Sequence, residues 1–165
     1  MREDNEMRIA VFPGSFDPVT VGHLDLIQRA SVMFDKVVIG VLNNSAKKPF
    51  CTVEQKMEML KLSTQDISNV EIESFDGLLV DFVEKKNAVA VIRGIRNSMD
   101  FEYELPLAQA NHKLNANADT IFLATRPEHS YISSSAVREL IKYKADIKDM
   151  VPEPVYRFVM DEFAY

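Results

Sequence analysis

The fold of this chain is decided near its beginning, where residues 8–23 read RIAVFPGSFDPVTVGH. The first five residues of this stretch are an apolar run that ends at Pro13-Gly14, a pattern that predicts a buried strand followed by a turn. Thr20 can cap a helix that begins directly after the turn, which would put residues 22 and 23 in its first turn. The apolar residues of this predicted helix recur at helical spacing: Leu24, Ile27, Ala30 and Phe34.

Strands and helices are expected to alternate along the rest of the chain. Apolar or alternating runs predict strands at residues 36–42, 70–73, 88–92 and 120–123. Helical patterns occupy about residues 52–62, 78–86, 99–115, 133–141 and 152–163. Pro106 should kink the third of these helices or start a new one. Such alternation is typical of a parallel sheet covered on both faces. We therefore expect an α/β fold, a doubly wound five-stranded parallel sheet in a single domain at residues 8–165, after a flexible tail at residues 1–7.

Composition narrows the class of protein. The 165 residues are 47% hydrophobic and carry a formal net charge of −6. This acidic balance argues against broad contact with a nucleic-acid backbone, although a small basic pocket for phosphates stays compatible with it. Cys51 is the one cysteine, so no intrachain disulfide can form, and we expect a small buried or half-buried side chain there rather than a nucleophile. Because neither a signal peptide nor a membrane-spanning run is visible, we expect a cytoplasmic protein that binds no membrane.

The unusual motifs fall where the predicted strands end. Ligands of parallel sheets bind past the carboxyl ends of the strands, which here directs attention to residues 13–22, 43–52, 74–77, 93–98 and 124–134. In the first of these loops Gly14 allows a close approach of the backbone to a ligand. His23 would stand in the first turn of a helix, where backbone amides and the helix dipole favour an anion, and it could donate a hydrogen bond to a phosphate oxygen.

Basic and hydroxyl side chains follow the later strands. Arg93 and Arg96 flank Gly94, and arginine forks bind phosphate with two hydrogen bonds. Three serines, residues 133–135, stand at a predicted helix start, where hydroxyls and unpaired amides could hold an anion, although simple capping needs only one of them. Lys47 lies in the loop after the second strand, where lysines are usually solvated charges.

Four of these stretches resemble those of the phosphopantetheine adenylyltransferases. Residues 14–23 are similar to the T/H-x-G-H signature of the nucleotidyltransferase superfamily, whose members have a Rossmann-like fold and bind ATP or CTP at the histidine. The common pattern has histidine where Thr20 stands, and threonine there is characteristic of this family. The other similar strings are I-R-G-x-R…D-F-E-Y-E (residues 92–104), I-S-S-S-x-V-R (residues 132–138) and K-K-P (residues 47–49). The resemblance runs from about residue 8 to residue 160 and identifies residues 8–165 as a nucleotidyltransferase domain.

The resemblance implies an activity and roles for individual residues. It implies transfer of AMP from ATP to 4′-phosphopantetheine, giving dephospho-coenzyme A and pyrophosphate in coenzyme A biosynthesis, by direct in-line attack of the substrate phosphate. His23 is the expected catalytic residue, and no protein metal site is expected because Mg²⁺ would arrive with ATP. The expected contacts of the acceptor substrate are Ser15, Lys47, Leu79 and Arg93. The expected contacts of ATP are Ser15, Phe16, His23, Gly94, Ile95, Arg96, Glu104, His129, Ser130, Tyr131, Ile132, Ser133, Ser134 and Ser135.

Two of these residues have a second interpretation. His129 stands where the family more often has an aromatic residue, so a contact through its backbone is favoured over one through its side chain. Leu79 could line the pantetheine arm, or it could simply be a residue of a short helix that packs against the protein core. By resemblance we also expect a homohexamer, with coenzyme A as a feedback ligand.

Alternative functions remain open at this point. Another small-molecule nucleotidyltransferase, such as a nicotinamide-mononucleotide adenylyltransferase or a glycerol-phosphate cytidylyltransferase, is disfavoured by Thr20 and by residues 100–104. A non-catalytic nucleotide-binding regulator is disfavoured because His23, Arg93 and Arg96 are all present. The sequence contains neither a G-x-x-x-x-G-K-[ST] loop nor a G-x-G-x-x-G after the first strand, which argues against P-loop kinases and dinucleotide dehydrogenases.

Overall fold

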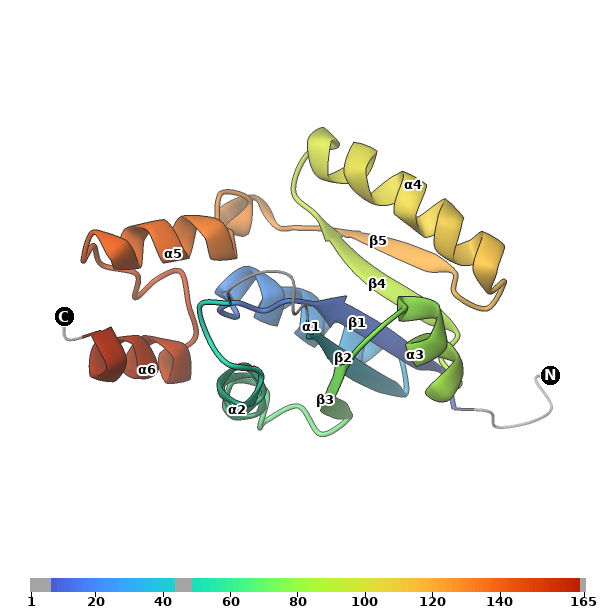
Figure 1. Cartoon of the computed structure of the whole chain (residues 1–165), viewed down its shortest axis with the longest axis horizontal. Coiled ribbons are helices and arrows are strands. Elements are labelled where there is room, and N and C mark those ends of the chain that lie inside the picture. Colours follow the sequence, from blue (N-terminus) through green and yellow to red (C-terminus); the bar gives the residue numbers. More distant parts are fainter. Residues whose placement is uncertain (1–6, 44–48, 164–165) are drawn as a thin grey trace.

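A computed structural model describes residues 7–43 and 49–163 of the chain. These residues form a five-stranded sheet in the order β3-β2-β1-β4-β5, with every neighbouring pair parallel (Figure 1). The strands are β1 (Ile9–Gly14), β2 (Lys36–Leu42), β3 (Val70–Phe75), β4 (Ala90–Ile95) and β5 (Thr120–Ala124). The helices are α1 (Val21–Met33), α2 (Val53–Ser63), α3 (Leu79–Lys85), α4 (Ser98–Leu114), α5 (Ser134–Lys142) and α6 (Glu153–Phe163), with a short 3₁₀ helix η1 (Pro127–His129). The predicted Rossmann-like parallel sheet is confirmed.

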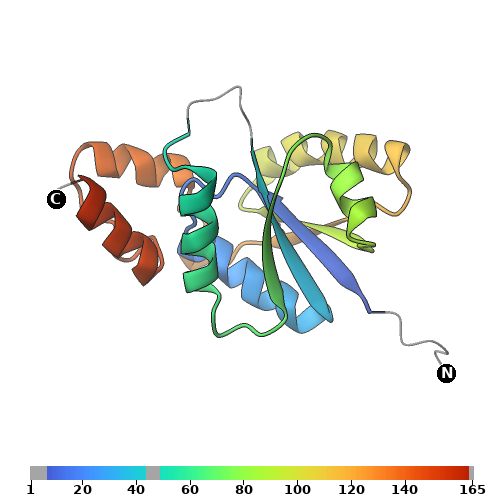
Figure 2. The same ribbon diagram turned by 60° about the horizontal axis from the view of Figure 1, so that its bottom comes forward.

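Both faces of the sheet carry a buried core. Successive side chains of a strand point to opposite faces, so Ala10 and Phe12 of β1 pack in a cluster with α1, α2, α5 and α6, while Val11 packs with α3. Figure 2 shows α1 and α2 on one side of the strands and α3 and α4 on the other. Helices α5 and α6 lie beyond the carboxyl end of β1, at the far end of the molecule from the start of this strand (Figure 1).

Local signals set the starts of two helices. Thr20 caps α1 and Thr52 caps α2. In each case the side chain three residues later, His23 or Gln55, accepts a hydrogen bond from the backbone N–H of the capping threonine. This reciprocal capping box satisfies backbone donors that a helix start otherwise leaves unpaired. The cap at Thr20 agrees with the sequence prediction.

Several predicted boundaries were wrong. Pro13 and Gly14 belong to β1, where a turn was expected, and β4 runs from Ala90 to Ile95 rather than from residue 88 to residue 92. The ladder uses backbone groups, so it continues past the apolar run for as long as the partner strand continues: Gly14 pairs with Val41, and Ile95 pairs with Ala124. The helix at residues 98–114 is one element with Pro106 inside it, so no new helix begins there.

Other sequence-based expectations concern the ends of the chain and Cys51. Residues 1–6 of the predicted tail lie outside the described residues, and Met7 is exposed. Cys51 is buried, and burial, with the neighbouring Asp17 charge as a second cause, raises the pKa of its thiol to about 12. The thiol therefore stays protonated at neutral pH and is a poor nucleophile. Among the helices of the described residues, none combines the length and the apolar character that a membrane span requires.

Candidate active site

Two adjoining cavities open at the carboxyl ends of β1 and β4. The first has a volume of about 320 Å³ and lies between the first loop, the end of β4, the start of α4 and the segment from Thr125 to Ser134. The second, of about 370 Å³, is more apolar and is lined by residues that include Leu42, Phe75, Leu79 and Leu107. The residues shared by both are Pro13, Gly14, Ser15, Arg93 and Glu104. A ligand with a polar and an apolar part could therefore lie across this shared border.

His23 lies in the first cavity with a defined tautomer. The backbone N–H of Thr20 donates to His23 Nδ1 at 3.1 Å, and the Thr20 hydroxyl oxygen lies 3.1 Å from the same nitrogen. Because a backbone amide can only donate, Nδ1 must accept, and the proton of the neutral ring is on Nε2. Burial, with the charges of Arg96 and Arg93 as further causes, lowers the pKa of His23 from 6.5 to about 4. At neutral pH His23 is therefore an uncharged imidazole with an Nε2–H donor.

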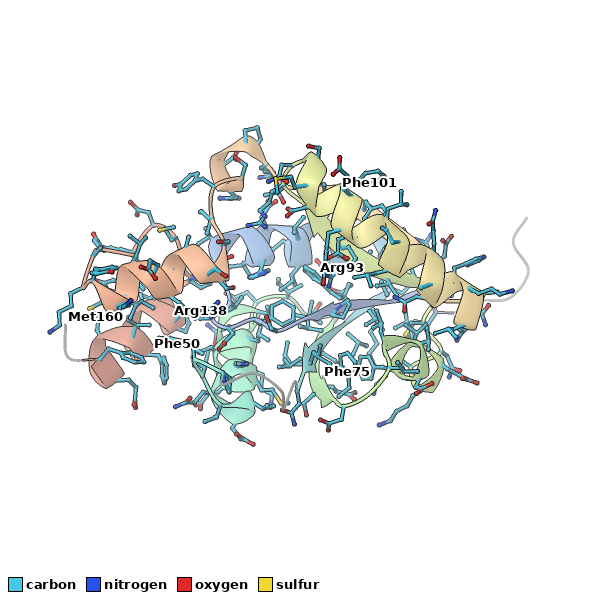
Figure 3. The ribbon with its side chains drawn as sticks, turned by 45° about the horizontal axis from the view of Figure 1, so that its top comes forward. Phe50, Phe75, Arg93, Phe101, Arg138 and Met160 are labelled. Carbon is cyan, nitrogen blue, oxygen red and sulfur yellow. The ribbon has the colours of Figure 1, made fainter. Side chains whose placement is uncertain are left out.

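Arg93 is held by a fork of hydrogen bonds at the border of the two cavities. Its Nε and Nη2 donate to the two carboxylate oxygens of Glu104, at 2.8 Å for Nε, and its Nη1 donates to the carbonyl oxygen of Pro13 at 2.8 Å. In Figure 3 Arg93 lies between the end of β1 and α4. A guanidinium held on both sides in this way has a fixed orientation.

Arg96 is paired with the first turn of α4. Its Nε and Nη2 each donate to Asp100 at 2.9 Å, and its backbone N–H donates to the same carboxylate at 3.0 Å. These hydrogen bonds lower the pKa of Asp100 and raise the pKa of Arg96. Both side chains are partly exposed to the cavity, so an anionic ligand could compete with Asp100 for the guanidinium.

The three serines at the start of α5 have separate roles in the protein. Ser133 caps the helix by accepting from the amide of Ala136 at 3.1 Å, and the hydroxyl of Ser134 donates to the carbonyl of Pro18 at 2.8 Å. The Ser135 hydroxyl accepts from Arg138 at 3.1 Å. Since Ser133 and Ser134 line the first cavity, the N-terminus of α5 opens toward it and its backbone amides could bind an anion.

Most of the predicted site residues come together in this region. Those that line the first cavity are Ser15, Phe16, His23, Arg93, Gly94, Arg96, Glu104, His129, Ile132, Ser133 and Ser134. Leu79 lines the second cavity. The lining of the first cavity does not include Ile95, Ser130, Tyr131 or Ser135, and Lys47 lies outside the described residues.

Gly94 shows why a small residue is needed in this wall. A Cβ atom built on it would lie 2.3 Å from Cδ1 of Leu26, closer than two non-bonded carbon atoms come, so the Leu26 side chain would have to shift. Because Gly94 lacks that atom, β4 packs closely against α1, the helix that carries His23.

The structure adds lining residues that the sequence reasoning did not assign. Asp100 and Tyr103 lie in the cavity, and both belong to the D-F-E-Y-E string that was quoted only as a family signature. Thr125 directly follows β5 and could have been found from its place at a strand exit. Within the described residues, no group of three or more His, Cys, Asp or Glu side chains is arranged to hold a metal ion.

Comparisons with known proteins show which family this chain resembles. The family model described as cytidylyltransferase-like matches residues 11–140. The phosphopantetheine adenylyltransferase of Lachnoclostridium phytofermentans is 49% identical over 157 residues, covering 95% of this chain and 96% of that protein. The one from Caldanaerobacter subterraneus subsp. tengcongensis is 47% identical over 157 residues, covering 95% and 98%.

A solved structure shares the fold at low sequence identity. A Vibrio parahaemolyticus protein, provisionally named a nicotinate-nucleotide adenylyltransferase, superposes with a TM-score of 0.71 at 16% identity, covering 95% of this chain and 94% of that one. At this identity the likeness supports the fold alone.

The state of His23 can be measured directly by NMR. We expect the imidazole of His23, assigned by its loss in His23→Asn, to stay neutral as the pH falls from 8 to about 5, because its pKa is near 4 in the folded chain. In denaturant the same ring should titrate near its usual value of about 6.5. A folded-state titration near pH 6.5 would contradict the neutral tautomer assigned to the ring.

The same shift has a consequence for stability. Between about pH 4 and pH 6.5 the unfolded chain binds a proton at His23 that the folded chain does not, so this residue makes folding less favourable as the pH falls through that window. Urea unfolding of wild type and His23→Asn at pH 7.5 and pH 5 should therefore show a smaller loss of unfolding free energy in the variant.

Proposed function

Since the chain belongs to the phosphopantetheine adenylyltransferase family, within the cytidylyltransferase-like proteins, we propose that it transfers AMP from ATP to 4′-phosphopantetheine. The products are dephospho-coenzyme A and pyrophosphate. The observation that best supports this reaction is the pair of adjoining cavities that share Ser15, Arg93 and Glu104. The polar cavity around His23 suits a nucleotide, the apolar one suits a pantetheine arm, and the acceptor phosphate would meet the nucleotide at their shared border.

The proposed chemistry is direct in-line attack of the acceptor phosphate on the α-phosphorus of ATP. A phosphate monoester has a second pKa of about 6 and is mostly dianionic at pH 7, so it needs no general base. A neutral His23 with its proton on Nε2 could not take a second proton readily, but it could donate a hydrogen bond to the oxygens of the transferring phosphoryl group. The remaining work is positioning and charge stabilisation.

The other proposed contacts fall into two groups, one for the acceptor substrate and one for ATP. Arg93 and Lys47 would hold the incoming phosphate, with Ser15 at the junction and Leu79 along the pantetheine arm. Arg96 and the start of α5 would bind the ATP phosphates, as Arg96 exchanges its bonds with Asp100 for bonds to the nucleotide. The further proposed nucleotide contacts are Phe16, Gly94, Ile95, His129, Ser130, Tyr131, Ile132, Ser133, Ser134 and Ser135.

Glu104 is better explained as the partner of Arg93 than as a nucleotide contact. Both of its carboxylate oxygens already accept from that guanidinium. We propose that Glu104 orients Arg93 for the acceptor phosphate.

Mg²⁺ is proposed as the metal of the reaction. It would be held mainly by the ATP phosphates and water, which is usual for a cation that keeps much of its hydration shell, and it would neutralise charge on the leaving pyrophosphate. We propose the cytoplasm as the site of the reaction, in keeping with the buried, unpaired Cys51.

We also propose a homohexamer, with coenzyme A as a feedback ligand. None of the α4 residues, all of which are described, is buried in the monomer, and the exposed apolar side chains of α4 that line neither cavity include Met99, Phe101 and Leu114. Exposed apolar side chains gathered on one element favour an interface. Coenzyme A shares the adenylate and pantetheine parts of the proposed product and could lie across both cavities.

Light scattering of the purified protein should give the mass of six chains, and a monomeric mass would reject the hexamer.

The proposed reaction is tested by pyrophosphate release from ATP and Mg²⁺ with and without 4′-phosphopantetheine. We expect release that depends on the acceptor, with dephospho-coenzyme A identified as the product by mass. Parallel reactions with nicotinamide mononucleotide and, with CTP, glycerol phosphate cover the other acceptors of this superfamily. Turnover with one of these instead would reassign the acceptor, and no turnover with any would favour a nucleotide-binding regulator.

His23→Ala should lower kcat by about a hundredfold to a thousandfold, the usual cost of losing one donor to a transition state, roughly 2.7–4 kcal/mol. ATP should still bind, as measured by calorimetry, because the other phosphate contacts remain. His112→Ala, an exposed histidine near the end of α4, is the matched control and should leave kcat unchanged. Near-normal turnover in His23→Ala would reject the assigned role.

Glu104→Gln separates orientation of Arg93 from contact with the nucleotide. The neutral amide keeps the shape but loses one of two accepting oxygens, so Arg93 becomes less well oriented while its charge is no longer balanced. We expect kcat to fall by about tenfold or more, with no rise in KM for phosphopantetheine. A rise in KM for ATP with normal kcat would instead indicate a nucleotide contact. Glu102→Gln, on the exposed face of the same helix, is the control.

A further inference from the structure

The side-chain carboxylate of Asp17, in the first loop, is buried and has no role in the proposed reaction. The side chain of Asp17 is only 12% exposed. One of its oxygens accepts from the backbone N–H of Cys51 at 2.8 Å, and the other accepts from that of Phe50 at 2.9 Å. The ammonium of Lys56 lies 3.5 Å from the first oxygen and is itself buried. The carboxylate thus joins the first loop to the start of α2.

The backbone around Asp17 is held from a second direction by α5. The guanidinium of Arg138 donates to the carbonyl of Asp17 at 2.7 Å, and the hydroxyl of Ser134 donates to the carbonyl of Pro18 at 2.8 Å. Figure 3 labels Arg138, which lies on α5, and Phe50, which lies just before α2. Elements that are far apart in the sequence therefore converge on the turn formed by residues 16–20.

The turn needs such support because of its neighbour Phe16. This residue has a φ of +44°, a region that bulky side chains rarely adopt and that persists only where the surroundings impose it. Phe16 as a whole is nevertheless only 2% exposed, so the strained residue is fixed in the core.

This turn also sets the orientation of His23. The ring of Phe16 meets the imidazole edge-on, with centroids 5.2 Å apart. The backbone N–H of Thr20, at the other end of the turn, donates to Nδ1 of the same ring. Val19 and Thr20 are 1% and 2% exposed, so the segment between Asp17 and this amide is itself packed in place.

We propose that Asp17 is a positioning residue for His23: its buried carboxylate, bonded to the amides of Phe50 and Cys51 and paired with Lys56, holds the turn that fixes the ring and its tautomer. Asp17 touches neither substrate in this account and acts through Phe16 and Thr20. Its contribution to the reaction rests on the proposed function, whereas its effect on the His23 ring does not.

The competing explanation is that Asp17 only stabilises the fold. Removing one partner of a buried ion pair leaves the other charge uncompensated and destabilises a protein strongly, whereas replacing both with neutral residues of similar shape is often tolerated. The single variant Asp17→Asn and the double variant Asp17→Asn with Lys56→Met therefore differ in stability. Both variants lack the carboxylate. The amide group that replaces it can accept at only one of the two positions where backbone donors point.

The experiment measures three quantities on both variants: the melting temperature, kcat with both substrates saturating, and the ¹⁵N shifts of the His23 ring nitrogens. The control is Val155→Ala, a fully buried position in α6, which lowers stability through a cavity in a helix outside the first loop. If Asp17→Asn alone does not fold, the double variant carries the test.

The expected result is a folded double variant with kcat at least about tenfold lower than wild type and with His23 nitrogen shifts moved toward the average of the two neutral tautomers. Val155→Ala should melt earlier but keep the wild-type shifts and kcat. Wild-type shifts in the folded double variant would overturn the proposal, as would a loss of kcat in Val155→Ala equal to that of the Asp17 variants at matched melting temperature.

The two proposals fail in different ways. If the wild-type protein does not transfer AMP to phosphopantetheine, the proposed function fails, and the ring shifts of the Asp17 variants still decide whether Asp17 positions His23. If the wild type turns over and the variants keep both shifts and kcat, only the positioning role is rejected.

Discussion

The parallel pairing of β1 with β2 on one side and β4 on the other is the constraint on which the site depends. The strand order reverses at β1, and the chain leaves β1 and β4 toward different sides of the sheet, which opens a crevice at their carboxyl ends. Gly14 at the end of β1 and Arg93 near the end of β4 face this crevice. The cavities at this edge therefore follow from the topology before any side chain is considered.

The charges of the crevice are arranged locally and do not follow the acidic total of the chain. Arg93 is held by Glu104, and Arg96 is held by Asp100, so each cation has a carboxylate partner that fixes its direction before a ligand arrives. The nearby guanidinium charges help keep His23 neutral. A site preorganised in this way spends little free energy on rearranging its dipoles during a reaction.

The order of strands and helices could be predicted because apolar periodicity reports burial, and burial is what a sheet covered on both faces imposes. Element boundaries were harder to predict. Arg93 and Gly94 looked like a loop, yet they continue β4, since the ladder depends on the backbone of β5 and not on apolar side chains. The helix that passes through Pro106 shows the same limit, because local propensity does not include the contacts of the whole element.

The sequence by itself determined the alternation of elements, the helix cap at Thr20 and the identity of the residues at the strand exits, because these depend on spacing and on neighbours three or four positions away. Only the tertiary structure decided which partners those residues meet. The pairing of Arg93 with Glu104 and the bonds from Phe50 and Cys51 to Asp17 join residues 11 to 34 positions apart. Hydrogen bonds require a distance near 3 Å and a direction, and for groups so far apart along the chain only the packed fold supplies both.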